Sequence, residues 1–197
     1  MSTVANVPAC MTVDEFLDWE PGDGRAWQLV DGEPKAILPA RPAHGALHAE
    51  LGALTGNHFV ARNSACSALM NVGVLPHLRR SHNLRIPALA ITCSDDQIQE
   101  DALTDPVLVV EIPSPDNRAE TWISLWSYAS IPSVREILVL SSITVGADLL
   151  RRSADGSWPQ NPETILEGDL ILGSIGFRMP LADIYRTTHL RRPPSDR

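Results

Sequence analysis

The feature that most constrains the fold of this chain is a short apolar segment that contains one acid. Residues 107–112 run VLVVEI, and Glu111 interrupts an otherwise unbroken series of aliphatic side chains. A continuous apolar run is typical of a strand buried on both faces of a sheet. An ionised carboxylate is costly to bury there unless it finds a partner or takes up a proton. The segment therefore predicts a central strand with an acid whose position needs an explanation.

Two explanations of Glu111 stay open on position alone. In the first, the acid lies at the end of the strand, where it reaches solvent or pairs with an arginine. In the second, it is a metal ligand or a general base at the edge of a sheet.

The rest of the chain predicts a mixed α/β fold, with a mixed β-sheet flanked by few helices. Leu47, Leu51 and Leu54 repeat at helical spacing, and Thr12 and Glu15 have the spacing of a capping box. Helices are expected at 13–19, 43–63, 117–130 and 180–188, a hairpin at 26–38, an extended segment at 67–76, strands at 84–92, 106–112, 134–141 and 145–152, and two short strands within 164–172. The polar loop at 95–100 joins the first two of these strands.

The length of the chain indicates how many domains it forms, and its charge indicates which partners it favours. A chain of 197 residues suits one domain, which we place at 11–189, between tails at 1–10 and 190–197. The net charge of −8 counts against strong non-specific binding of nucleic acid. No apolar run approaches the ~18 residues that would span a bilayer, so we expect no membrane association, and the first residues do not resemble a signal peptide.

The cysteines indicate a cellular compartment. Cys10, Cys66 and Cys93 are odd in number, lie far apart and form no CxxC motif. This usage is typical of a reduced, cytoplasmic protein without a structural zinc.

Several short segments, taken in order, resemble one family. MTVDEFLDWE, WQLVDGEP, the pair His44-Gly45, RIPALAITC, PVLVVEIPSP and SYASIPSVREILVL are similar to successive motifs of the Uma-type restriction endonucleases, a bacterial branch of the PD-(D/E)XK nuclease superfamily. The resemblance covers nearly the whole chain, and an ordered series of matches is far more specific than any one of them.

The resemblance implies a restriction-endonuclease-like core and a Mg²⁺-dependent cleavage of DNA. In such enzymes one or two Mg²⁺ ions are held by the aspartate of a P-D motif and by the glutamate on the next strand, which here is Glu111. A lysine orients the attacking water or neutralises developing charge. The resemblance also implies a homodimer, and no small-molecule cofactor is expected.

This chain departs from the family's pattern at the residues that matter most. Ala88 occupies the position of the P-D aspartate, and a methyl group cannot ligate a cation. Pro113 and Ser124 occupy the two positions where the lysine is found, on the strand or on the following helix. Lys35, beside the early hairpin, is the only lysine in the sequence, so no other lysine can have taken over the role.

The matching residues that remain are Glu111, Glu33, Ser114 and His44, whereas Gln28 stands where many members have a glutamate. We therefore expect site residues Glu111, Ala88, Ser114 and Glu33, with Glu111 as the metal ligand. Two functions follow: a Mg²⁺-dependent endonuclease by ancestry that is weak or inactive, or a non-catalytic binding or dimerisation scaffold of the same fold.

Other candidates have weaker support. His44 and His48 have metal-binding spacing, but the sequence places no third ligand, so His44 is expected to cap or pack at the helix start, with the cleft as the alternative. Trp122 and Trp126 could stack on bases, although core packing is the preferred interpretation. Ser114 lacks the partners of a serine nucleophile and is expected to bond local backbone or a site water.

The adjacent arginines Arg79-Arg80 and Arg151-Arg152 could contact phosphates, but paired arginines are more often found on solvated surface.

Overall fold

The computed structural model describes residues 7–94, 101–114 and 118–191, with the backbone alone at 118–121. Its helices are α1 Val13–Leu17, α2 Pro42–Ala61, α3 Arg118–Ala129 and α4 Leu181–Ile184, with 3₁₀ turns η1 Arg80–His82, η4 Gly173–Ile175 and η5 His189–Arg191. The strands are β1 Trp27–Val30, β2 Glu33–Ala36, β3 Ser67–Met70, β4 Leu89–Thr92, β5 Leu108–Glu111, β6 Glu136–Leu140, β7 Ala147–Arg151, β8 Glu163–Ile165, β9 Asp169–Leu172 and β10 Phe177–Pro180.

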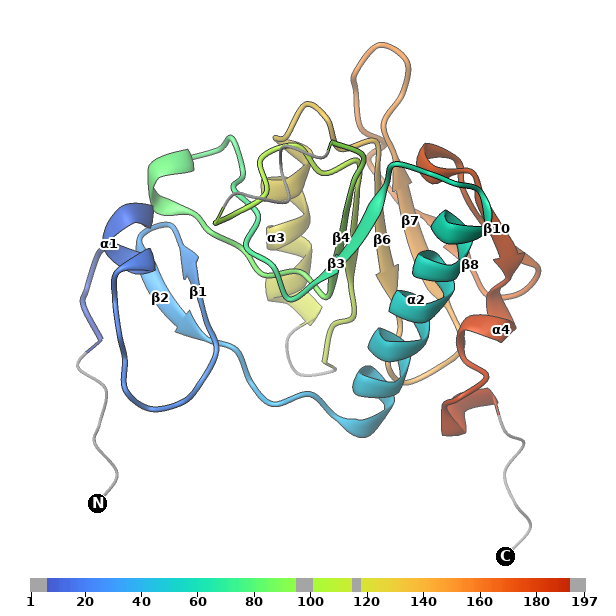
Figure 1. Ribbon diagram of the computed structural model, residues 1–197, viewed down its shortest axis with the longest axis horizontal. Helices are drawn as coiled ribbons and strands as arrows, with labels where there is room; N and C mark the ends of the chain where they lie inside the picture. The colour runs from blue at the N-terminus through green and yellow to red at the C-terminus, as the bar shows by residue number, and fades with distance from the viewer. Residues whose placement is uncertain (1–6, 95–100, 115–117, 192–197) are drawn as a thin grey trace, which may run out of the picture.

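A mixed sheet in the order β3-β4-β5-β6-β7-β8 forms the centre of the molecule. Strands β5 and β6 are parallel, and the other neighbours in this sheet are antiparallel. Helix α3 makes the crossover between the two parallel strands (Figure 1). This is the mixed α/β fold expected from the sequence.

Helices α2 and α3 cover opposite faces of the sheet (Figure 1). Successive side chains of a strand point to opposite faces, so Leu108 and Val110 of β5 pack in the cluster that contains α2. Val109 packs in the cluster of Leu125 and Tyr128 from α3. Glu111 follows Val110, and this alternation directs its side chain to the face of α3.

Prolines explain why two strands are shorter than predicted. The strand expected at 84–92 begins only at Leu89, because Pro87 has no N–H to donate to a ladder. Residues 84 and 85 instead make isolated bridges to Leu29 and Val74. Pro106 and Pro113 similarly flank β5, which the sequence analysis placed at 106–112.

The C-terminal region differs from the prediction. The two strands expected within 164–172 exist, but only β8 joins the central sheet, whereas β9 pairs with β10 in a separate sheet. Strand β10 was not predicted, and the last α-helix spans 181–184 instead of 180–188. The loop expected at 95–100 lies outside the described residues, and the limits of the two tails stay a prediction.

The expectation that the cysteines are reduced is wrong for two of them. Cys66 and Cys93 form a disulfide at the ends of β3 and β4, and Cys10 is free. Register explains the pairing, since Ser67 lies opposite Thr92 and the two cysteines are the next pair outward. No described helix combines the length and the apolar character that a membrane span requires.

Candidate functional site

The strand register brings the two motif positions to one edge of the sheet. Leu89 lies opposite Val110 in the antiparallel pair β4–β5, so Ala88 is level with Glu111. On the other side, Glu111 is paired with Val139 of β6. Glu111 is the last residue of β5, which places its carboxylate where the sheet ends.

The carboxylate of Glu111 is surrounded by hydrogen-bond donors. The hydroxyl of Tyr128, on α3, donates to Oε1 at 2.8 Å, and the backbone N–H of Ala88 also donates to this carboxylate. Burial is the dominant influence and raises the pKa of Glu111 to about 7, although Tyr128, Arg85 and Ala88 oppose the rise. The first explanation offered by the sequence agrees with this geometry, because the acid lies at a strand end near an arginine, whereas a role as metal ligand or general base stays a prediction.

Arg85 is the buried cation of this region. Its side chain is 4% exposed, and Nη1 lies 3.3 Å from Oγ of Ser124. Burial lowers its pKa, while the negative charges of Glu111 and Asp31 and the phenol of Tyr128 raise it. A buried charge must be paired or hydrogen-bonded to be tolerated, and the opposite charges of Arg85 and Glu111 stabilise each other.

A cavity of about 240 Å³ opens beside Glu111. Its lining combines motif residues with the β1–β2 hairpin and the start of α2: Gln28, Ala36–Arg41, His44, Asn71, Ile86, Ala88, Glu111–Ser114, Ser124 and Ser142. Three of the four predicted site residues, Ala88, Glu111 and Ser114, therefore meet in one place. Glu33 does not line it, because its exposed side chain lies on β2 near Lys35.

Two of the three histidines of α2, His44 and His48, lie next to the motif strands. Nε2 of His48 is hydrogen-bonded to the carbonyl of Ala88, and His44 interacts with the backbone of Ile112. Burial, followed by the nearby His48, lowers the pKa of His44. His44 faces the cavity, which was the alternative position considered for it. Within 7–94, 101–114 and 118–191, no cluster of three potential ligands exists to support a zinc site.

None of the aromatic and arginine candidates lines the cavity at Glu111. Trp126 is 52% exposed, so the expected core packing is wrong for it, whereas Trp122 packs partly buried against the α3 cluster. Arg151 bonds Glu136, and Arg152 donates to the carbonyls that end α3 and lies over the ring of Trp158.

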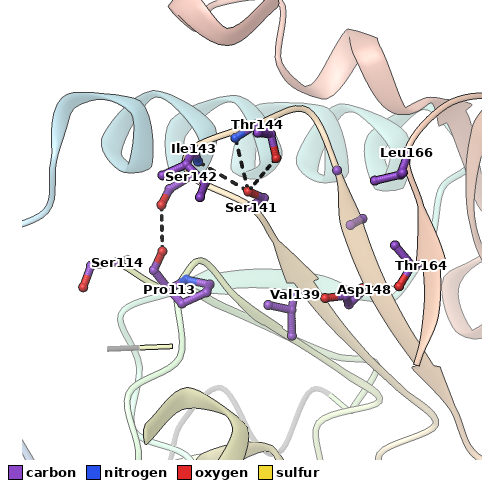
Figure 2. A pocket seen from close by; sticks show the side chains of 12 residues that line it. Pro113, Ser114, Val139, Ser141, Ser142, Ile143, Thr144, Asp148, Thr164 and Leu166 are labelled. Carbon is purple, nitrogen blue, oxygen red and sulfur yellow. Dashed lines mark hydrogen bonds between the residues drawn. The ribbon is translucent and has the colours of Figure 1, made fainter. Parts of the chain in front are cut away.

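A second cavity, of about 140 Å³, adjoins the first and was missed by sequence reasoning. The two share Pro113, Ser114 and Ser142. Figure 2 shows the turn from Ser141 to Thr144 on one side of this second cavity, with Asp148 and Thr164 on the other. The signal in the sequence was a polar residue, Asp148, inside the otherwise apolar strand ADLL.

The residues around Glu111 do not fit a tight Mg²⁺ site. Mg²⁺ is usually held through one or two carboxylates together with several waters, and among the described residues that line its cavity Glu111 is the only carboxylate. Asp148 is level with Glu111 but two strands away, which separates their backbones by about 10 Å. Strand side chains stand roughly perpendicular to the sheet, so the two carboxylates remain apart.

The crossover fold, with an acid at the end of a central strand above a shared cavity, is the arrangement of a nuclease-like α/β protein. Residues 13–181 match the model of the Uma2 family, described as "Putative restriction endonuclease". The chain belongs to this family.

Two further comparisons agree with this assignment. An uncharacterised protein of Synechocystis sp. is 27% identical over 182 residues, which cover 89% of this chain and 92% of the relative. The crystal structure of a "putative nuclease" belonging to DUF820, from Anabaena variabilis, superposes with a TM-score of 0.72 at 15% identity, covering 89% of this chain and 98% of the other. At this identity the structural likeness shows the fold alone.

Proposed function

We propose that this chain is a degenerate member of its family, in which Mg²⁺-dependent cleavage of DNA is weak or lost. One observation carries the proposal: Glu111 lines the cavity with no second carboxylate among the lining residues that the structure describes, and Ala88 fills the position level with it. Even changes outside the direct ligands of a metal typically cost about 10–100-fold in affinity or activity. The loss of a direct ligand costs at least as much.

The protonation of Glu111 supports the same conclusion. A carboxylate binds a metal only when it is deprotonated, and burial raises the pKa of this one to about 7. The hydroxyl of Tyr128 already occupies Oε1. Near neutral pH the acid is therefore partly neutral and well satisfied by its own donors.

The direct test is to restore the aspartate. We expect the unmodified chain to show no saturable binding of Mg²⁺ or Mn²⁺ in calorimetry at millimolar ion, and no cleavage of a supercoiled plasmid. Ala88→Asp should gain metal binding and measurable nicking. The matched control is Ala40→Asp, which adds the same charge to the rim of the same cavity away from Glu111 and should gain neither.

Two results would contradict the proposal. Metal-dependent cleavage by the unmodified chain, abolished by Glu111→Gln, would mean that the present site is competent. If Ala88→Asp folds normally but neither binds metal nor cuts DNA, Ala88 is not the cause of the lost activity.

A second candidate function is the scaffold, as a homodimer or as a binding module. It is favoured by the outer face of α3, where Ile123 and Trp126 are 68% and 52% exposed. They are three residues apart and hence neighbours on the helix surface. Sedimentation velocity of the chain and of Trp126→Glu tests the dimer, which should dissociate in the variant if this face is the contact.

The cytoplasmic location expected from the sequence is part of this proposal. The Cys66–Cys93 disulfide counts against this location, because the cytosol keeps most thiols reduced. Alkylation of intact cells followed by mass spectrometry shows whether the two cysteines are paired in the cell.

A further inference from the structure

The second cavity continues the row of residues that contains Glu111. Register pairs Glu111 with Val139, Val139 with Asp148, and Asp148 with Thr164. Residues directly opposite each other on paired strands point to the same face. The row therefore runs from the cavity at Glu111 into the adjoining cavity, whose polar side is formed by Asp148 and Thr164 (Figure 2).

The chemistry of the second cavity differs from that of the first. Apolar walls come from Pro113, Val139 and two exposed side chains, Ile143 and Leu166 (55% and 68% exposed). Large apolar side chains left in solvent around a cavity are suited to the faces of a flat, weakly polar group. The carboxylate of Asp148 repels a phosphate but attracts N–H donors, and charge-assisted hydrogen bonds are the stronger kind.

The size of the cavity matches one ring system. A water molecule needs about 10–15 Å³ of such space, so 140 Å³ provides about ten atomic positions. A purine base has ten or eleven non-hydrogen atoms once its exocyclic groups are included, which is about the same size.

We propose that this second cavity binds the guanine base of an unpaired nucleotide, with Asp148 accepting the N–H groups of its Watson–Crick edge. Only guanine, among the common bases, presents two adjacent N–H donors there, at N1 and at the 2-amino group, and two donors match the two oxygens of a carboxylate. Thr164 donates to Oδ1 of Asp148 at 2.7 Å and so fixes its orientation. A carboxylate offers about four acceptor sites in all, so it can accept from more than one donor at a time.

The position of the phosphate follows from the shared wall. A nucleotide with its base at Asp148 would pass Pro113, Ser114 and Ser142 and place its phosphate toward Arg41 and His44 in the first cavity. This placement rests on the proposed function, because it takes the cavity at Glu111 as the former phosphate site. The base must also be unpaired, because its Watson–Crick edge cannot contact Asp148 from within a duplex.

The test is equilibrium binding to the full, unmodified chain in EDTA. Guanosine monophosphate (GMP) should bind about 10–100-fold more tightly than adenosine, cytidine and uridine monophosphates, as expected for hydrogen bonds to a charged group. Inosine monophosphate (IMP), which differs from GMP only by the missing 2-amino group, should bind about tenfold more weakly than GMP. Equal affinity for all five, or no saturable binding, would overturn the proposal.

A pair of variants tests whether Asp148 is the cause of the preference for GMP over IMP. Asp148→Asn keeps the shape but replaces one acceptor with a donor, so the ratio of GMP to IMP affinity should fall to about one. Glu167→Gln removes the same charge from an exposed neighbour that does not line the cavity, and the ratio should stay unchanged. A ratio that survives in Asp148→Asn would refute the assignment, provided that the melting temperature of the variant is unaltered.

The source of the guanine is settled by oligonucleotides. If nucleic acid is the ligand, a single-stranded oligomer with one guanine should bind more tightly than GMP, and inosine at that position or a complementary strand should weaken binding. If free nucleotides are the ligand, the oligomer should bind no better than GMP. Because these measurements use no metal and retain Ala88, their outcome is independent of whether Ala88→Asp restores cleavage.

Discussion

The buried carboxylate of Glu111 predicts an unusual dependence of stability on pH. Its pKa in the folded chain is about 7, against 4.5 for an ordinary glutamate. The folded state therefore holds a proton between these pH values that the unfolded state releases, and stability falls as pH rises through this window. At about 1.36 kcal/mol per pH unit, the shift corresponds to about 3 kcal/mol lost between pH 4.5 and 7.

Glu111→Gln isolates this contribution. The amide has nearly the same shape, carries no charge and does not titrate. Urea unfolding of both proteins at pH 5 and pH 8 gives the difference in free energy of unfolding at each pH. Relative to the variant, the unmodified chain should lose about 2–3 kcal/mol between the two. Other groups, including His44, titrate in both proteins and largely cancel.

An exposed acid provides the control. Glu33 has a side chain that is 66% exposed and near Lys35, so Glu33→Gln should leave the pH dependence of the unmodified chain unchanged. If Glu111→Gln shows the same pH dependence as the unmodified protein, within about 0.5 kcal/mol, Glu111 is not a buried titrating group. The account of its protonation, and the support it lends to weak metal binding, would then fail.

Three further predictions concern neighbouring contacts. Tyr128→Phe removes a donor that favours the charged form of Glu111, so the pKa of Glu111 in a ¹³C NMR titration should move above that of the unmodified chain. Glu136→Ala strips a buried carboxylate from Arg151 and from two backbone N–H groups and should cost about 1–3 kcal/mol in chemical denaturation for each N–H left without a partner. Reducing the Cys66–Cys93 disulfide, whose cysteines are 27 residues apart in the sequence, should lower the free energy of unfolding by about 3–4 kcal/mol according to the loop-entropy relation. The stability of Cys93→Ser should not change when reductant is added.

The order of elements could be predicted because each follows from a local pattern. The capping box at Thr12 is present with both of its hydrogen bonds, and the leucine spacing located α2 to within two residues at each end. Partners were harder to predict, because register is a property of two segments. Nothing local distinguishes β8, which joins the central sheet, from β9, which pairs with β10.

The candidate site was predictable only where a single strand reveals it. Glu111 could be identified because it interrupts an apolar run and Ala88 because it departs from a motif, and the structure brings both to one cavity. Arg85 was seen as part of a motif, but its burial and its contact with Ser124 depend on α3 folding back over β5. Asp148 was missed because its place in the row across four strands depends on register, and its only local signal was a polar residue between apolar ones.

Ala88 and Ser124 stand where the resemblance to the family implies an acid and a base, so the loss of one charge is expected to compensate for the loss of the other. The guanidinium of Arg85 lies against Ser124 and near Glu111, so one cation already faces one carboxylate. Ser124→Lys alone would add a second cation beside Arg85, and Ala88→Asp alone a second carboxylate beside Glu111, and each should destabilise the chain without metal. The double variant has two of each. A double-mutant cycle on the free energy of unfolding in EDTA should therefore give a favourable coupling of about 0.5–3 kcal/mol. Additive effects would mean that the two positions changed independently.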